Sequence, residues 1–186
     1  MAGLCSSRGH TPQSDDVAED LLSALKESGQ RTWLHPGYLE ERRSVEAWLH
    51  SEFVKKGKQP HLKSPLYFVL GEYDDFFNEG GFFSGSSPKK LELPLSLFDS
   101  DMISFTYPDS MPSLAIATDT TGRGDDYRKP IHGKVFTDEE IVDVIEEYGM
   151  PGDRWKTEEY WRFDRLVEVQ VWDDRPVWQF MQSDQA

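Results

Sequence analysis

In the segment 162–177, valines alternate with larger side chains, and this period of two predicts a β-strand. Successive side chains of a strand point to opposite faces, so one face is uniform and the other mixed: Val167, Val169 and Val171 against Leu166, Glu168, Gln170 and Trp172. The valine face is typical of a hydrophobic core. The other face places the carboxylate of Glu168 in mid-strand, which fits either a solvated sheet position or a group held in a cleft.

Further strands are predicted by short apolar or alternating runs bounded by turn residues: 66–70, 91–95, 102–107 and 134–136. Pro94 confines the second of these to a sheet edge or a strand start, because proline cannot donate a ladder hydrogen bond. Residues 114–117 form a short apolar run, and the turn 173–176 directs the chain toward 177–180.

Helices are predicted at 14–29, from Pro36 to about Lys56, after residue 137 and, briefly, at 157–163. Thr137 and Glu140 have the spacing of a capping box, and Gly149 ends the helix that they open. Residues 72–90 and 118–128 are rich in glycine and polar residues and are expected to be loops.

The order of these elements predicts an α+β fold, because no regular crossover helices separate the strands. We expect a single domain over 14–186, with a mixed or antiparallel, possibly split, sheet and two N-terminal helices. Residues 1–13 lack any periodicity and are expected to be a disordered tail.

Composition indicates a soluble protein with a core, since 37% of the 186 residues are hydrophobic and 13% are aromatic. No apolar run approaches the roughly 20 residues that span a bilayer, and the N-terminus has no apolar signal core, so a cytoplasmic location is expected. The single cysteine, Cys5, excludes an internal disulfide and a cysteine-based zinc cluster.

The formal net charge of −14 argues against non-specific nucleic-acid binding, because such a chain repels polyanions. The same charge suits a non-enzymatic acidic interaction protein. A protein partner could then bind the acidic surface and the phenylalanine-rich loop from Phe76 to Phe83.

Several familiar kinds of site lack their sequence patterns. The histidines are isolated and form no His-x-x-x-His pair for zinc. Gly80, Gly81 and Gly85 lack the spacing and the following helix of a phosphate-binding loop. A serine hydrolase elbow of the form Gly-x-Ser-x-Gly is absent from the sequence.

Two segments resemble the DNA-directed (DarT-type) ADP-ribosyltransferases. Residues 93–98 and 103–111 (LPLSLF and ISFTYPDSM) resemble that family's passage of proline, apolar spacer, Phe-Tyr-Phe and x-x-Arg-Ser-Pro-Met. Residues 167–171 (VEVQV) resemble its strand of the form Ala-Glu-Phe-Leu-Val, whose glutamate is catalytic. Asp109 stands where the family has an arginine, so the substrate, or even the activity, can differ.

The resemblance implies an enzyme that uses NAD, with Glu168 as the catalytic carboxylate. Such a group can stabilise the oxocarbenium-like state formed when the nicotinamide glycosidic bond breaks. The residues that could bind NAD are Arg31, His35, Tyr107, Ser110 and Arg128, and those that could bind the second substrate are Gln170 and His132.

Several of these residues also have structural interpretations. His35 before Pro36 can shape a turn, Tyr107 can belong to the core, and Arg128 can be an ordinary surface charge. The non-enzymatic acidic interaction protein therefore remains the alternative to the transferase.

Overall fold

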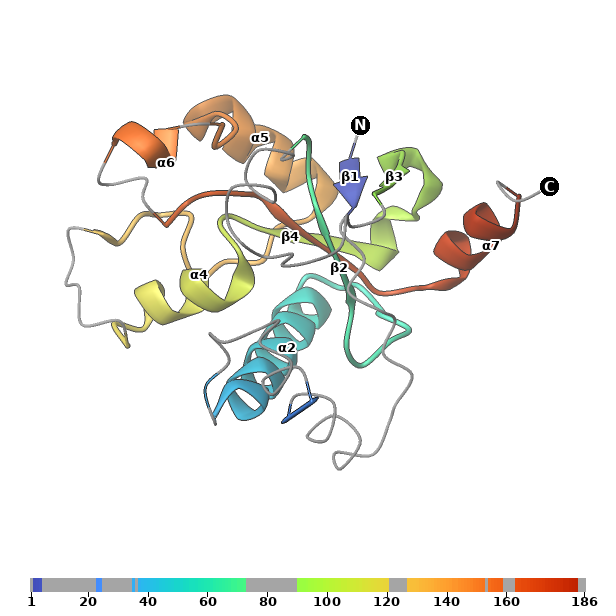
Figure 1. The fold of residues 1–186 in the computed structure, drawn as a ribbon, viewed down its shortest axis with the longest axis horizontal. Coiled ribbons are helices and arrows are strands. Elements are labelled where there is room, and N and C mark those ends of the chain that lie inside the picture. The colour runs from blue at the N-terminus through green and yellow to red at the C-terminus, as the bar shows by residue number, and fades with distance from the viewer. Residues whose placement is uncertain are drawn as a thin grey trace.

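An antiparallel sheet forms the centre of the chain in the computed structural model, which describes residues 2–4, 23–24, 35, 37–72, 90–120, 127–152, 154–158 and 163–183. The strands follow the order β3-β1-β2-β5-β4, and each pairing is antiparallel. Their bounds are β1 Ala2–Leu4, β2 Leu66–Val69, β3 Leu91–Leu93, β4 Ile103–Thr106 and β5 Glu168–Val171. Together with the helices around the sheet (Figure 1), this confirms the predicted single α+β domain.

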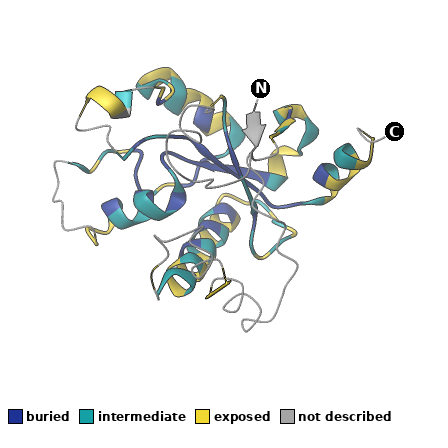
Figure 2. Cartoon of the chain, in the orientation of Figure 1, coloured by how far each residue is buried: buried dark blue, intermediate teal, exposed yellow. Residues whose placement is uncertain are grey.

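Strand β5 is the alternating segment, and it lies between β2 and β4. Val169 is the partner of Phe68 in β2 and of Phe105 in β4. All four residues of β5 are buried, as the dark strands of Figure 2 show. Glu168 is only 6% exposed, so its position on a solvated sheet face is excluded.

The helices are divided between the two faces of the sheet. Figure 1 shows α2 and α4 on one side and α5 and α6 on the other, with α7 following β5. Their bounds are α2 Tyr38–Lys55, α4 Ser110–Ala117, α5 Asp138–Tyr148, α6 Arg154–Thr157 and α7 Arg175–Ser183, with 3-10 turns η1 Leu95–Leu97 and η2 Ser100–Met102. No helix among the described residues is both long and apolar enough to cross a membrane.

The alternation of β5 separates two hydrophobic clusters. On the valine face, Val169 and Val171 pack with Phe105 and with Ile141 of α5. On the opposite face, the buried Trp172 packs against α2, where its ring stacks on Phe53 with 5.9 Å between the ring centroids. The second face therefore has an apolar end at Trp172 and a polar end at Glu168.

Several predicted elements are confirmed close to their expected bounds. Helix α2 corresponds to the helix predicted from Pro36 to about Lys56. Strands β2, β3 and β4 match three predicted strands, and β3 lies at the edge of the sheet. The capping box of α5 is complete, because Thr137 Oγ1 accepts from Glu140 N at 3.3 Å and Glu140 Oε2 accepts from Thr137 N at 2.9 Å. Gly149 ends α5 at a φ of 76°.

Other elements differ from the predictions. The apolar run 114–117 is the end of helix α4, which begins at Ser110 because Asp109 caps it by accepting from Met111 N at 2.9 Å. The predicted short strand 134–136 is reduced to a single bridge between Phe136 and Phe105. Residues 154–157 form the brief helix α6, and residues 159–162 of the predicted helix 157–163 lie outside the described residues.

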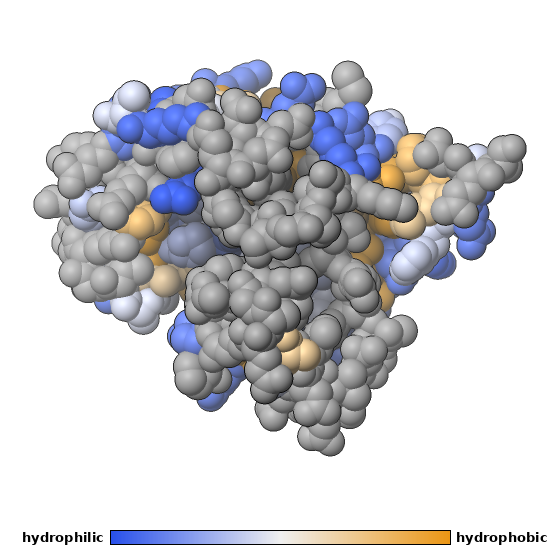
Figure 3. Space-filling model, viewed as in Figure 1, coloured by the Kyte–Doolittle hydropathy of each residue, from blue (hydrophilic) through white to orange (hydrophobic). Residues whose placement is uncertain are grey.

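The amphipathic helix α7 begins at Arg175, inside the predicted turn 173–176. Val177 is buried, and Phe180 and Met181 pack against the cluster on the valine face. Trp178 points away from that cluster and is 48% exposed. Figure 3 shows an apolar area beside α7.

Some predictions fall largely outside the described residues. Of the predicted tail 1–13, Ala2–Leu4 is described and pairs as β1 with β2 and β3. Of the predicted helix 14–29, Ser23 and Ala24 are described, and both are helical. The loop from Phe76 to Phe83 and Arg31 lie outside the described residues.

Candidate functional site

A row of buried polar side chains lines the face of the sheet under α2 and α4. Ser104 and Thr106 of β4 alternate with core residues, as do Glu168 and Gln170 of β5. The register places Thr106 opposite Glu168 and Ser104 opposite Gln170. These four side chains therefore meet because two alternating strands are paired in one register.

Gln170 orders this row through hydrogen bonds on both sides of its amide. Its Oε1 accepts from Ser104 Oγ at 2.9 Å, and its Nε2 donates to Thr106 Oγ1 and to Glu168 Oε2, each at 3.0 Å. Trp172 Nε1 donates to Ser104 Oγ at 2.9 Å, which extends the chain to the apolar end. The prediction that Gln170 lies beside Glu168 is met, and the network fixes its orientation.

One oxygen of Glu168 receives all the hydrogen bonds that the described residues give it. Besides Gln170, Ser110 N donates to Oε2 at 3.0 Å and Thr106 Oγ1 donates at 3.5 Å. No described residue donates to Oε1. The carboxylate is thus held firmly through one oxygen, while the other keeps its capacity to accept a hydrogen bond.

The first turn of α4 brings a second carboxylate to this site. Asp109 caps the helix, and the next residue, Ser110, gives its backbone N–H to Glu168. Burial and the nearby charge of Glu168 raise the pKa of Asp109 to about 7. Asp109 can therefore exchange a proton near neutral pH.

Helix α2 supplies a cation to the same region. Arg42 lies with its Cζ 3.6 Å from the centre of the Tyr67 ring, and its Nε is 3.4 Å from Glu46 Oε1. Burial acts to lower the pKa of Arg42, but the charges of Glu168 and Asp109 help to raise it above its usual range. Burial raises the pKa of the Tyr67 phenol, which also donates to Glu46 Oε1 at 3.4 Å.

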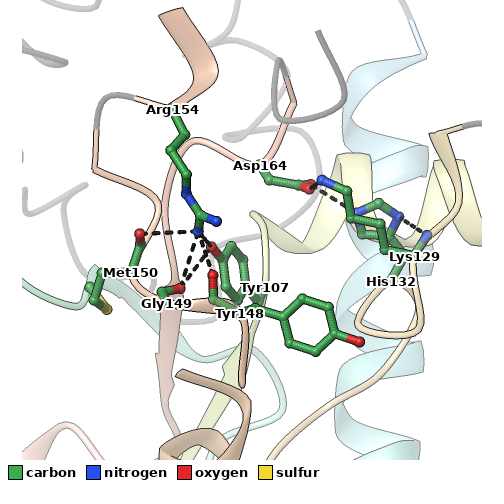
Figure 4. Close-up of polar contacts among 8 residues, drawn as sticks. All are labelled: Tyr107, Lys129, His132, Tyr148, Gly149, Met150, Arg154 and Asp164. Carbon is green, nitrogen blue, oxygen red and sulfur yellow. Dashed lines mark hydrogen bonds and ion pairs between the residues drawn. The ribbon is translucent and has the colours of Figure 1, made fainter. Parts of the chain in front are cut away.

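Tyr107, named above as a residue that could bind NAD, lies on the opposite face of the sheet from Glu168. Thr106 faces Glu168, so the next residue, Tyr107, points to the opposite face and packs in the cluster with Val169. Tyr107 is fully buried, and its hydroxyl donates to Gly149 O at 3.1 Å and accepts from Arg154 Nη2 at 3.2 Å (Figure 4). It is a core residue and has no face available for stacking on nicotinamide.

The other predicted cofactor residues are distributed over the chain. His35 is exposed before α2, where its Nε2 lies 3.3 Å from Glu41 Oε2. Arg128 is exposed in the segment that follows residue 127. Ser110 reaches Glu168 through its backbone, and its Oγ is buried with no hydrogen-bond partner among the described residues.

His132 belongs to an internal ion cluster with Asp164 and Lys129 (Figure 4). Its Nδ1 accepts from Lys129 N at 3.1 Å, so Nε2 carries the proton and donates to Asp164 Oδ1 at 2.8 Å. Lys129 Nζ pairs with Asp164 Oδ2, and burial lowers the pKa of Lys129. Both ring nitrogens of His132 are engaged, so it anchors the segment leading to β5 rather than offering a group to a substrate.

Sequence reasoning missed Arg42, Tyr67 and Thr106 as neighbours of Glu168. The alternation of β4 carried a signal for Thr106, but placing it opposite Glu168 required the strand register. Strand β2 is an uninterrupted apolar run and gave no such signal for Tyr67. Within the described residues, no group of three or more His, Cys, Asp or Glu side chains could hold a metal ion.

No protein-family model matches the chain, and no curated protein or solved structure matches it. Function is therefore inferred from the chemistry of the site. It combines a carboxylate clamped through one oxygen, a second carboxyl group whose pKa is near neutrality, and a largely buried guanidinium on an aromatic ring.

Proposed function

We propose that the chain is an ADP-ribosyltransferase-like enzyme that uses NAD, with Glu168 as the catalytic carboxylate. The observation that carries this proposal is the asymmetric clamping of Glu168, whose Oε2 accepts three hydrogen bonds while Oε1 accepts none from the described residues. A carboxylate held in this way is preorganised to stabilise positive charge without first being reoriented.

Transfer of ADP-ribose from NAD needs a carboxylate beside the ribose from which nicotinamide leaves. The bond between ribose C1′ and the nicotinamide nitrogen breaks, and its electron pair neutralises the pyridinium ring. The Oε1 atom of Glu168 can accept a hydrogen bond from a ribose hydroxyl, and the carboxylate offsets the oxocarbenium charge. The acceptor then bonds to C1′ and loses a proton.

Asp109 is suited to receive that proton. Its pKa of about 7 lies near the operating pH, where a general base is most effective. It is attached to the same helical turn that binds Glu168, which keeps the two carboxyl groups in a fixed relation. The positive charge of Arg42 limits the repulsion between the two carboxyl groups. Arg42 is also the cation of this site that could bind an anionic part of the substrate.

The test is the rate at which purified protein releases nicotinamide from NAD, compared with Glu168→Gln. Glutamine keeps the shape and one acceptor oxygen for the Ser110 and Thr106 donors, so we expect a folded variant with at least a hundredfold lower rate, as for loss of one electrostatic stabiliser. Glu92→Gln changes an exposed glutamate of β3 and is the matched control. Equal rates for Glu168→Gln and the wild type would overturn the proposal.

The alternative is the non-enzymatic acidic interaction protein. It stands if the wild type neither binds NAD, measured by calorimetry, nor releases nicotinamide with any acceptor mixture. The net charge of −14 supports that alternative.

A further inference from the structure

A groove lies between α2 and α4, the two helices on the sheet face that carries Glu168. Its volume is about 730 Å³, within the range of ~300–1,000 Å³ that is usual for ligand sites. The lining residues all come from the two helices and their ends, and they include Glu40, Glu41, Ser44, Val45, Met111 and Leu114.

The groove has an apolar floor and an acidic rim. Val45, Met111 and Leu114 contribute apolar side chains at its base. Glu40 and Glu41 are exposed along the edge formed by α2, and no lysine, arginine or histidine is among the lining residues. Figure 3 shows hydrophobic residues over α4 next to hydrophilic residues over the start of α2.

We propose that this groove binds a short segment of a partner protein that carries arginine or lysine next to leucine-like side chains. Arginine and lysine match both parts of the groove, since their aliphatic stems can pack on Met111 and Leu114 while their charged ends reach Glu40 and Glu41. Methionine adapts its shape to varied partners. The net charge of −14 attracts a basic segment over a longer range.

The existing contacts of the rim leave it open to such a partner. Glu41 Oε2 lies 3.3 Å from His35 Nε2, but the Glu41 side chain is 59% exposed and the His35 side chain 50% exposed. Exposed ion pairs of this kind contribute little to stability, so a guanidinium can replace His35. Ser44 Oγ donates to Glu40 O of the helix backbone, so this hydrogen bond does not engage the Glu40 carboxylate.

The groove does not depend on the proposed transferase, because its lining residues exclude Glu168, Asp109 and Arg42. Peptide binding and NAD consumption can therefore fail separately. Met111 follows Ser110 on α4, so the groove reaches the first turn of the helix, whose Ser110 N–H donates to Glu168.

The experiment measures fluorescence anisotropy of a labelled peptide of about nine residues that alternates arginine with leucine, added to the full chain. We expect saturable binding that is lost when glutamate replaces arginine in the peptide. The double change Glu40→Gln and Glu41→Gln should weaken binding about two- to fivefold for each carboxylate removed, from the strength of exposed ion pairs. Ser44→Tyr, at an exposed position, should fill the groove and weaken binding more than tenfold.

The matched control is the double change Glu139→Gln and Glu146→Gln, which removes the same charge from exposed positions of α5. If the control weakens binding as much as the groove variants, attraction by net charge alone explains it and the proposal is overturned. Binding of the small cation agmatine as tightly as the peptide would also overturn it. Retained binding by a folded Ser44→Tyr protein would place the peptide elsewhere.

Discussion

Asp109 caps α4 at a position where its own negative charge is unfavourable. Its Oδ1 accepts from Met111 N at 2.9 Å, and the adjacent Ser110 N donates to Glu168. Burial and the charge of Glu168 raise the pKa of Asp109 from its usual 3.8 to about 7. Between these values the folded chain keeps a proton on Asp109 that the unfolded chain has released.

This difference fixes the direction of a pH effect on stability. Because the folded state binds more protons at this site, the contribution of Asp109 to the unfolding free energy falls as the pH rises from about 4 to about 7. The upper limit over that range is ~4 kcal/mol, at ~1.4 kcal/mol for each pH unit. Asp109 is partly exposed, so solvent screening reduces this limit.

Asp109→Asn removes the charge and retains an oxygen that can cap α4. We expect the stability of this variant relative to the wild type to increase by on the order of 2 kcal/mol between pH 5 and pH 8, with the rise complete a little above pH 7. Urea unfolding followed by circular dichroism at several pH values measures the difference. Asparagine also caps helices well, which keeps the helix itself unchanged.

Asp99→Asn is the matched control for this experiment. Asp99 is exposed and caps η2 by accepting from Asp101 N at 3.0 Å, so its replacement shows what loss of a capping carboxylate does without a buried glutamate nearby. A difference between Asp109→Asn and the wild type that stays constant with pH, or increases toward low pH, would refute the proposed coupling of Asp109 to Glu168.

Three further changes test other parts of the structure. Thr137→Ala removes the capping box with Glu140 and should lower the unfolding free energy by about 1 kcal/mol in urea titrations; an unchanged midpoint would contradict the cap. Hydrogen bonds from Arg175 lower the pKa of Asp173 to about 2. In the same urea titrations, Asp173→Asn should therefore lose about 1 kcal/mol of unfolding free energy at pH 5, and this loss should vanish as the pH falls from about 4 toward 2. Ser110→Ala removes a buried hydroxyl without a partner and should leave stability unchanged or raise it by about 1 kcal/mol, measured by thermal melting; a clear loss would show that the hydroxyl is bonded.

The elements that sequence predicted well are those specified by local signals. Alternation identified β5, and Thr137 with Glu140 identified the start of α5, because side-chain period and capping depend on neighbours within one turn or strand. Helix α4 was missed because it has only eight residues and Pro112 interrupts its helical pattern, although Asp109 was present as a cap. Helix α7 was missed because its first residues, Arg175 and Pro176, were assigned to a turn.

The site was only partly predictable because its members meet through strand register and helix packing. Glu168 and Gln170 share a face by their spacing of two, which sequence shows. The pairing of Thr106 with Glu168 is not visible in the sequence, and it decides that Tyr107 lies on the other face. Arg42 reaches the site only because α2 packs across the polar face of the sheet.

The arrangement at Glu168 favours a functional role over a purely structural one. A glutamine at this position could accept from Ser110 and Thr106 through one oxygen, so the network does not require a charge. The charge instead acts against Asp109, whose pKa is raised first by burial and then by repulsion from Glu168. Like-charge pairs that lower stability are concentrated at functional sites. If Asp109→Asn and Glu168→Gln are each at least as stable as the wild type at pH 8 while Glu168→Gln no longer releases nicotinamide, the two carboxyl groups are retained for chemistry at the expense of stability.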